Sequence, residues 1–225
     1  MTTLNTANQK GKTMKNYESW WETNLDSDTY IHDGQRYDAP SRETFESWMG
    51  DHTARDREVA RLLMIDGYES VLDAGCGAAP EHQVIDPDKY FAMDITQKLV
   101  DYNVSRGIKC QQGSLMNMPY EDSKFDVVIS RHVTEHMAEI ETPLKEMVRV
   151  AKKQILLSFF IDPIDEAYHK IQLDNAGTDG EIYHNQYSQR IIEGILAGSS
   201  KVEGWTWHGG GAKTKTTRIL NIRLR

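Results

Sequence analysis

Val71-Leu72-Asp73-Ala74-Gly75-Cys76-Gly77 is the stretch that decides the fold of this 225-residue chain. An apolar run closes with an acid and then breaks into two glycines, which adopt backbone angles that other residues avoid and let a ligand approach the main chain. The pattern is typical of a buried parallel strand that ends in a ligand-binding loop.

Around this stretch, patterns typical of strands alternate with patterns typical of helices. The predicted strands after it span residues 90–94, 108–112, 125–130 and 154–161, and the predicted helices span 53–64, 97–105 and 143–151. Residues 201–208 and 216–225 predict an antiparallel hairpin at one edge. The alternation predicts an α/β, Rossmann-like, doubly wound seven-stranded sheet that is mostly parallel and ends in this C-terminal antiparallel hairpin.

The chain divides into three predicted regions. Residues 1–15 contain almost nothing apolar to bury, so a disordered tail is expected there. Residues 16–52 are rich in aromatic side chains and form either a helical arm that packs on the domain or a lid over a ligand. Residues 53–225 form the ligand-binding domain, with a long polar segment at 162–187 and a helix capped by Ser188.

Charge and cysteine content exclude several functional classes. The chain has 34 acidic against 26 basic residues and a formal charge of −8, which disfavours binding to nucleic-acid phosphates. No apolar run approaches the roughly 20 residues that a membrane span requires. Cys76 and Cys110 show no metal-ligand spacing, so two reduced thiols in a cytoplasmic protein are expected, with no metal site.

The residues after the glycines narrow the ligand of the loop. A dinucleotide fingerprint needs a third glycine where this chain has Pro80, which lacks an N–H, and Glu81 adds negative charge where a pyrophosphate would lie. S-adenosyl-L-methionine carries a sulfonium and no phosphate, so it fits better. Asp94 follows Gly75 by 19 residues and is positioned to accept both ribose hydroxyls.

Four motifs in register now define a resemblance. The opening stretch, Asp94-Ile95, the run Phe125 to Ser130, and Glu135-His136 resemble the successive motifs of class I S-adenosyl-L-methionine (SAM)-dependent methyltransferases, and the type 11 group in particular. The resemblance covers roughly residues 53 to 161. It implies SAM as the cofactor and S-adenosyl-L-homocysteine as the product.

The resemblance also implies roles for single residues. The methionine part of the cofactor would be lined by Asp73, Gly75, Cys76 and Gly77; the adenosine part by Asp94, Ile95, Ser114 and Leu115; and the surroundings of the sulfonium by the main chain at Arg131. Ser114 stands where the family often has an Asp, and Ala79-Pro80 replaces a commoner Thr-Gly or Ser-Gly. The helix after the turn is cut short by Asp86-Pro87, and this stunted helix suggests a more open cofactor end.

The pentad His132-Val133-Thr134-Glu135-His136 matches the H-x-x-E-H pattern of inverted zinc peptidases. Such a zinc site needs the pentad inside a helix, whereas a buried strand is predicted to end only two residues earlier, at Ser130. Within the methyltransferase interpretation, His132 is either a general base or a residue that packs or contacts the cofactor. His136 is either structural or a base on the substrate side.

Two motifs that the sequence lacks narrow the class of the methyl acceptor. Neither the Asn/Asp-Pro-Pro-Tyr/Phe motif of amino-methylating DNA enzymes nor a Pro-Cys nucleophile is present, which favours a small metabolite, sugar or peptide-like acceptor methylated at oxygen or nitrogen. The candidate substrate-binding residues are Tyr37, Tyr183, His184 and Tyr187. A SAM-binding sensor or inactive partner subunit is the alternative, and the sequence leaves the oligomeric state open.

Overall fold

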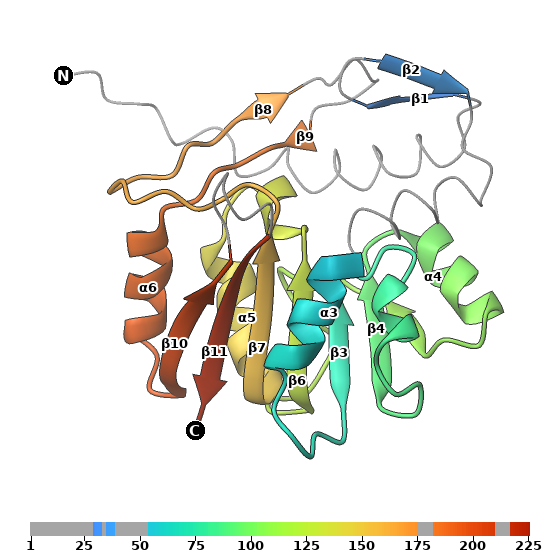
Figure 1. Ribbon diagram of the computed structural model, residues 1–225, viewed down its shortest axis with the longest axis horizontal. Helices are drawn as coiled ribbons and strands as arrows, with labels where there is room; N and C mark the ends of the chain where they lie inside the picture. The colour runs from blue at the N-terminus through green and yellow to red at the C-terminus, as the bar shows by residue number, and fades with distance from the viewer. Residues whose placement is uncertain (1–28, 33–34, 39–53, 175–181, 210–216) are drawn as a thin grey trace.

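A seven-stranded sheet forms the centre of the computed structural model (Figure 1). The structure describes residues 29–32, 35–38, 54–174, 182–209 and 217–225. The strands of the sheet lie in the order β10-β11-β7-β6-β3-β4-β5. Their bounds are β3 (Val71–Ala74), β4 (Tyr90–Asp94), β5 (Cys110–Gln112), β6 (Phe125–Arg131), β7 (Ala151–Phe159), β10 (Val202–His208) and β11 (Arg218–Leu224).

The five strands from β3 to β7 run parallel, and the hairpin β10–β11 joins β7 in antiparallel fashion. The predicted fold class is therefore confirmed, including the C-terminal antiparallel hairpin. The chain proceeds from β3 outward to β4 and β5 and then returns to the other side of β3 with β6. The neighbours β3 and β6 thus flank the switch point of the sheet, where open α/β sheets bind their ligands at the carboxyl ends of the strands.

In the described part of the chain, four α-helices connect and cover the strands: α3 (Ala54–Leu63), α4 (Gln97–Ser105), α5 (Glu141–Val150) and α6 (Gln189–Ala197). The predicted helix after Ser188 is confirmed, because the Ser188 side chain accepts a hydrogen bond from the Ile191 N–H and Gly198 ends the helix. Two short 3₁₀ helices, η2 (Pro80–Gln83) and η3 (Thr134–His136), follow β3 and β6. Pro80 opens η2, so the helix after the glycine turn is as stunted as the sequence suggests.

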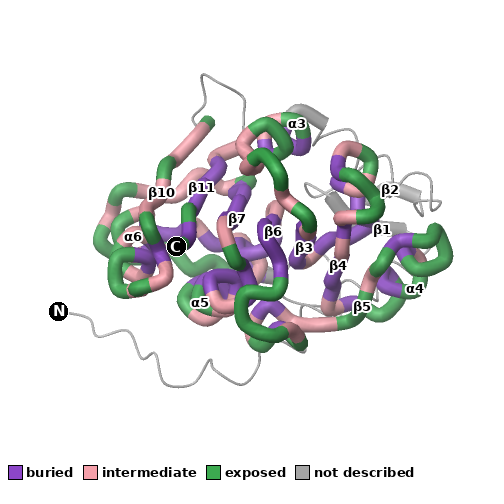
Figure 2. Tube along the Cα trace, turned by 90° about the horizontal axis from the view of Figure 1, so that it is seen from below, coloured by how far each residue is buried: buried purple, intermediate pink, exposed green. Residues whose placement is uncertain are grey.

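The core lies on both faces of the sheet, and the alternation of side chains along β6 divides it. Val127 and Ile129 pack in one apolar cluster together with Ala60 of α3. Val128 packs in the other, which contains side chains of α5 and α6. Figure 2 shows the buried residues concentrated along the central strands. None of the described helices combines the length and the apolar character that a bilayer span requires.

Several boundaries differ from the predicted ones. The strand expected at 154–161 begins at Ala151 and ends at Phe159, because Ala151 takes an extended conformation as soon as α5 ends. The polar segment 162–187 contains a small antiparallel pair, β8 (Leu173–Asp174) and β9 (Ile182–Tyr183), which Figure 1 shows above the carboxyl ends of the parallel strands.

The predicted tail 1–15 and most of the predicted arm 16–52 lie outside the described residues. Within the arm, the described backbone forms an antiparallel hairpin of β1 (Thr29–His32) and β2 (Gln35–Asp38), and the choice between a packed helical arm and a lid stays a prediction. Tyr37 pairs with Tyr30 in this hairpin. Its side chain is outside the described part of the structure.

Candidate functional site

The glycine turn after β3 has the backbone geometry that the sequence predicts. Gly75 and Gly77 both take positive φ angles, 80° and 55°. A Cβ atom added at Gly75 would lie 2.6 Å from a methyl carbon of Val133, in the loop that follows β6. The main chain at Gly75 lies so close to the loop across the switch point that no side chain fits there, and its φ angle also favours glycine.

Neighbouring strands hold the turn in place. The Gly75 and Cys76 N–H groups donate to the Met93 carbonyl at 2.8 and 3.0 Å, and the Gly77 N–H donates to Asp94 Oδ2 at 2.9 Å. The other Asp94 oxygen accepts the Thr96 N–H at 2.9 Å. Burial raises the pKa of Asp94, which is 7% exposed. The structure therefore joins the predicted ribose-binding acid directly to the predicted cofactor turn.

A buried polar cluster lies beneath this turn. Asp73 accepts a hydrogen bond from the Tyr90 hydroxyl at 2.5 Å, and Glu81 forms an ion pair with the Arg131 guanidinium. Burial, followed by the nearby Glu81, raises the pKa of Asp73 well above its ordinary value. The Arg131 and Glu81 side chains are only 8% and 4% exposed. The sequence had indicated Glu81 only as an obstacle to phosphate, and not as the partner of Arg131.

The charges of this region fit a cationic ligand better than an anionic one. Three buried acids, Asp73, Glu81 and Asp94, lie on or below the turn, and Arg131 is already paired with one of them. Side chains of α4 also bind the turn carbonyls, since Asn103 Nδ2 donates to Gly77 O at 2.8 Å. These buried acids suit a ligand with a sulfonium and an amino group, and they suit a pyrophosphate poorly.

The residues predicted to contact the adenine have mixed surroundings. Ser114 Oγ accepts the Met116 N–H at 3.1 Å, so the hydroxyl is engaged in its own turn. Leu115 is 5% exposed and packs in the core near Met93. Ile95 is partly buried, and its carbonyl accepts a hydrogen bond from the Gln112 amide at 3.0 Å.

His132 follows β6 with a φ of 58°, which is uncommon for a residue other than glycine. Its Nδ1 lies 3.4 Å from Arg131 Nη1, and its Nε2 lies 3.4 Å from Thr217 Oγ1 and 3.8 Å from Asp56 Oδ2. The Thr217 hydroxyl in turn donates to Asp56. Burial, the Arg131 charge and His136 lower the pKa of His132 to about 3, so the ring is neutral at neutral pH.

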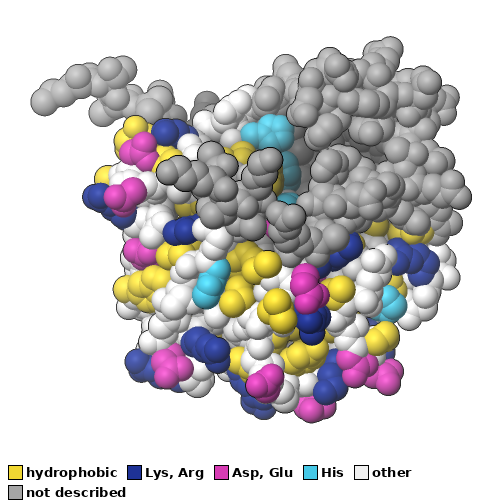
Figure 3. Space-filling view, viewed as in Figure 1, with side chains coloured by type: hydrophobic (Ala, Val, Ile, Leu, Met, Phe, Trp, Pro, Cys, Tyr) yellow, Lys and Arg dark blue, Asp and Glu magenta, His cyan; other side chains and the backbone are white. Residues whose placement is uncertain are grey.

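Three further rings gather beside His132. Phe160 lies 5.7 Å from His132 and 5.1 Å from His136, measured between ring centroids, and His184 lies 5.3 Å from His136. Burial lowers the pKa of His136 to about 4. Histidine side chains are visible together on the upper part of the face in Figure 3. The lowered pKa values of His132 and His136 leave these two rings uncharged at neutral pH.

The segment that carries the other predicted substrate residues is fastened to η3. The Tyr187 hydroxyl donates to the carbonyls of Thr134 and Met137, each at 2.8 Å, and Tyr187 is fully buried. Tyr183 is 5% exposed, and its carbonyl lies 2.7 Å from His136 Nδ1. Of the predicted substrate residues with described side chains, His184 is the one that is only partly buried and lies beside the ring cluster.

Glu135 is fully buried in the same region. One of its oxygens accepts the Phe160 N–H at 2.6 Å, and burial raises its pKa to about 7. Its carboxylate therefore fixes the loop at the end of β7 instead of facing a metal. The H-x-x-E-H pentad is not an α-helix, because His132 has a positive φ and only Thr134–His136 form a 3₁₀ turn. Among the described residues, no group of side chains is arranged to hold a metal ion.

Sequence reasoning missed Asp56, Thr217 and Phe160 as neighbours of His132. Asp56 lies in α3, Thr217 directly precedes β11 and Phe160 directly follows β7, and no local motif marks them. Asn103, which binds the glycine turn, was visible only as one polar position in a predicted helix.

The strand order and the geometry of the glycine turn define a class of protein. A parallel sheet with an antiparallel hairpin in this strand order, with a glycine turn and an acid at neighbouring strand ends, has the class I methyltransferase fold. Residues 72–159 match the family model described as a methyltransferase domain, so the predicted resemblance to class I methyltransferases is confirmed. The family and the fold imply SAM as the cofactor.

Curated relatives agree with this assignment. The uncharacterized methyltransferase YcgJ of Bacillus subtilis is 26% identical over 92 residues, which cover 37% of this chain and 36% of the relative. The demethylmenaquinone methyltransferase of Lactobacillus johnsonii is 26% identical over 117 residues, 46% of this chain and 48% of the relative. The matched segments span less than half of the length of these relatives.

Solved structures share the fold. The crystal structure of YcgJ superposes with a TM-score of 0.58 at 13% identity and covers 76% of this chain and 98% of its own. A Thermotoga maritima protein described as a SAM-dependent methyltransferase, a possible histamine N-methyltransferase, superposes with a TM-score of 0.59 at 14% identity and covers 82% and 96%.

Proposed function

We propose that this chain is an enzyme that transfers a methyl group from SAM to a small-molecule acceptor at oxygen or nitrogen. The observation that carries the proposal is the junction at the switch point, where the Gly77 N–H is bonded to Asp94 Oδ2. The matched methyltransferase domain supports it, and so do relatives whose names refer to small acceptors, demethylmenaquinone and histamine.

In this proposal the turn and the ends of the strands bind the cofactor. The main chain of Gly75 to Gly77 holds the methionine part, and Asp94 accepts the ribose hydroxyls with the lone pairs that its two backbone contacts leave. Asp73 places its carboxyl group below the turn, and Ile95 and Leu115 contribute apolar surface for the adenine. When bound, SAM supplies a methyl group activated by a positively charged sulfur.

The acceptor would meet the ring cluster of His132, Phe160, His136 and His184. Aromatic rings exclude water and pack against a flat or apolar acceptor. The pKa values of about 3 and 4 for His132 and His136 mean that both rings stay uncharged across the physiological range. We infer that the chain selects acceptors by shape and orientation.

We infer further that His132 positions the acceptor or the cofactor and is not a strong base. Arg131 Nη1 can only donate, so His132 Nδ1 accepts, and the ring proton lies on Nε2 toward Thr217. The Thr217 hydroxyl oxygen faces this ring N–H, and the hydroxyl itself donates to Asp56. Both ring nitrogens are thus engaged, which favours an acceptor that reacts as a neutral amine or an acidic hydroxyl and needs little help in losing a proton.

The test is calorimetric titration of the full chain with S-adenosyl-L-homocysteine, followed by a methyl-release assay over a panel of small amines and hydroxyl compounds. Asp94→Asn sets an amide N–H against the N–H of Gly77 or Thr96. A weakening of about 1–3 kcal/mol is expected, the scale of hydrogen bonds to a charged group. Asp101→Asn is the matched control, because Asp101 lies exposed on α4 and accepts only a helical contact from Gln97.

Equal affinities for the wild type and Asp94→Asn would contradict the assignment of the ribose site. Binding without methyl release from any acceptor in the panel would favour a SAM-binding sensor or an inactive partner subunit. We also propose where the protein acts and on which class of partner. Its net charge of −8 and its two free thiols support a cytoplasmic protein that acts on small molecules and not on nucleic acid.

A further inference from the structure

The two cysteines of the chain meet at the cofactor turn. Cys76 Sγ lies 3.9 Å from Cys110 Sγ, although the residues are 34 positions apart. Strand β4 brings them together, because the Cys76 N–H bonds to Met93 and Cys110 pairs with the adjacent Ala92. Both are free thiols. No other cysteine is present in the sequence, so a disulfide within this chain can join only this pair.

A buried amide faces both sulfurs. Asn103 Nδ2 donates to Gly77 O and lies 3.5 Å from Cys76 Sγ and 3.9 Å from Cys110 Sγ. The Asn103 side chain is fully buried, and its oxygen makes no hydrogen bond. The contact with the Cys76 thiol, aided by this amide, holds the pKa of Cys110 below its ordinary value, whereas the contact with Cys110 and burial raise the pKa of Cys76. Cys110 is therefore the thiol that ionises first.

The two thiols also differ in access. Cys110 begins β5, the outermost strand on its side of the described sheet, and is partly exposed, whereas Cys76 is only 3% exposed. A small oxidant can therefore reach Cys110 before it reaches Cys76. This asymmetry is the one required of an attacking and a resolving thiol.

We propose that Cys110 is a site of oxidation by hydrogen peroxide and that Cys76 resolves it into a disulfide that disables the cofactor turn. The Cys110 thiolate attacks one peroxide oxygen, the O–O bond breaks, and hydroxide leaves a sulfenic acid on Cys110. Hydroxide takes the proton of Cys76, and the resulting thiolate attacks the Cys110 sulfur and displaces a second hydroxide. With one proton from solvent for the first ionised thiol, two thiols and one peroxide yield one disulfide and two waters.

Closure of the disulfide must move the turn. An S–S bond is about 2.05 Å long, so the two sulfurs must approach by roughly 1.9 Å. Cys76 stands between Gly75 and Gly77 in the turn, directly before the N–H group that donates to Asp94. A shift of Cys76 displaces the Gly77 N–H from Asp94. The effect on ligand binding rests on the proposed function, because these groups are the ones assigned to SAM.

The experiment treats the reduced full chain with hydrogen peroxide, maps its peptides without reduction and titrates it with S-adenosyl-L-homocysteine. The expected result is a Cys76–Cys110 disulfide within one chain, a loss of affinity of roughly tenfold or more, and recovery with dithiothreitol. Cys110→Ala is expected to bind S-adenosyl-L-homocysteine like the reduced wild type before and after peroxide. Because nine methionines can also be oxidised, this variant separates thiol chemistry from general damage.

Each failure has its own signature. Absence of the disulfide, a disulfide between two chains, unchanged affinity in the oxidised protein, or equal loss in Cys110→Ala would each overturn the redox inference. Reduced wild type that does not bind S-adenosyl-L-homocysteine would overturn the proposed function instead. The peptide map still reports disulfide formation in that case, because it does not depend on the ligand.

Discussion

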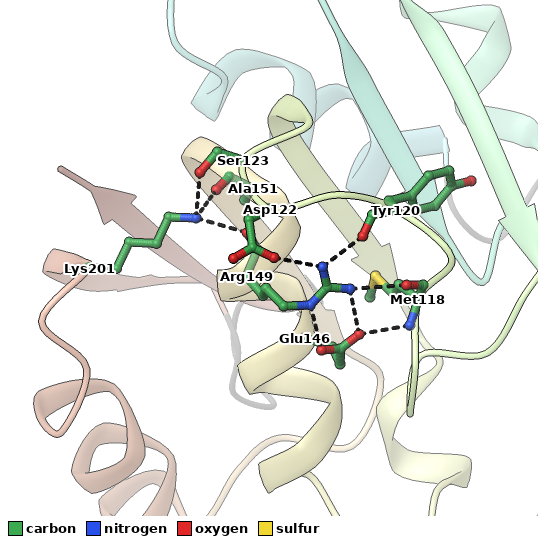
Figure 4. Close-up of polar contacts among 8 residues, drawn as sticks. All are labelled: Met118, Tyr120, Asp122, Ser123, Glu146, Arg149, Ala151 and Lys201. Carbon is green, nitrogen blue, oxygen red and sulfur yellow. Dashed lines mark hydrogen bonds and ion pairs between the residues drawn. The ribbon is translucent and has the colours of Figure 1, made fainter.

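Two polar networks lie at opposite ends of the central sheet, and they differ in how their charges are compensated. At the amino end of β7, Arg149 donates to Glu146, to Asp122 and to the carbonyls of Met118 and Tyr120 (Figure 4). These five bonds use all five N–H groups of the guanidinium. Lys201 likewise donates to the Arg149 and Ala151 carbonyls.

At the carboxyl end the balance is reversed. Asp73, Glu81 and Glu135 are almost fully buried, and Arg131 compensates only Glu81 by direct contact. Burial raises the pKa values of Asp73 and Glu135, whereas Glu146 at the other end has a lowered pKa because Arg149 binds it. Charged groups with all of their hydrogen bonds made stabilise a fold, whereas buried acids with raised pKa values destabilise it. Such unfavourable groups gather where a ligand is to be bound.

The largest effect is expected where the carboxyl end is geometrically tightest. Gly75→Ala adds a Cβ atom 2.6 Å from Val133 at a φ of 80°, which forces the turn or the loop after β6 to move. A loss of roughly 100-fold in affinity for S-adenosyl-L-homocysteine is expected from such a displacement. Calorimetric titration measures it.

Gly107→Ala is the matched control for this change. Gly107 has almost the same φ, 81°, but a Cβ atom there meets nothing within 4 Å. Both variants carry the backbone strain, of about 1 kcal/mol, and only Gly75→Ala carries the collision. Equal losses of ligand affinity in the two variants would assign the effect to stability and not to the site.

The amino-end network should behave in the opposite way. Arg149→Ala leaves the Met118 and Tyr120 carbonyls without this donor and leaves the Glu146 carboxylate with the Met118 N–H as its described donor, so a loss of about 2 kcal/mol in the free energy of unfolding is expected. Urea unfolding measures this loss, and the affinity for S-adenosyl-L-homocysteine of the folded protein should not change. Lys145→Ala removes one exposed pair with Glu141 on the same helix, and no measurable loss of stability is expected there.

The sequence predicted what is local and periodic. The limits of β4 and α4 agree with the predicted ones, and so does the cap at Ser188, because strand patterns and capping residues act within a few positions. The glycine turn and Asp94 were also accessible, because motif spacing encodes the loops at the ends of neighbouring strands.

What the sequence could not provide is contact between distant segments. Asp56 and Thr217 are 161 positions apart and meet beside His132 only because the fold brings α3 close to the residue that precedes β11. The same holds for the pairing of Glu81 with Arg131, 50 positions away. Tyr187 was predicted on the substrate side, but burial and its two carbonyl partners give it the task of fixing the loop, which a polar sequence motif does not reveal.

The smallest expected effect is a pH dependence of the free energy of unfolding, which the buried Glu135 at the carboxyl end of the sheet should cause. Burial raises the pKa of Glu135 to about 7 in the folded chain, against about 4.3 when unfolded, so between these values the folded state binds more protons. Stability from this group is therefore present at low pH and decreases as the pH rises toward 7. Between pH 6 and pH 8 the expected loss is about 1 kcal/mol, since one pKa unit corresponds to roughly 1.4 kcal/mol.

Glu135→Gln isolates this contribution, because the glutamine oxygen still accepts the Phe160 N–H and its amide can face Thr134. The difference in unfolding free energy between the wild type and Glu135→Gln should change by about 1 kcal/mol from pH 6 to pH 8, with the wild type relatively weaker at pH 8. Other titrating groups cancel in this difference. A difference that is constant with pH would mean that Glu135 is ionised throughout, and its carboxylate would then resemble the saturated charges at the amino end.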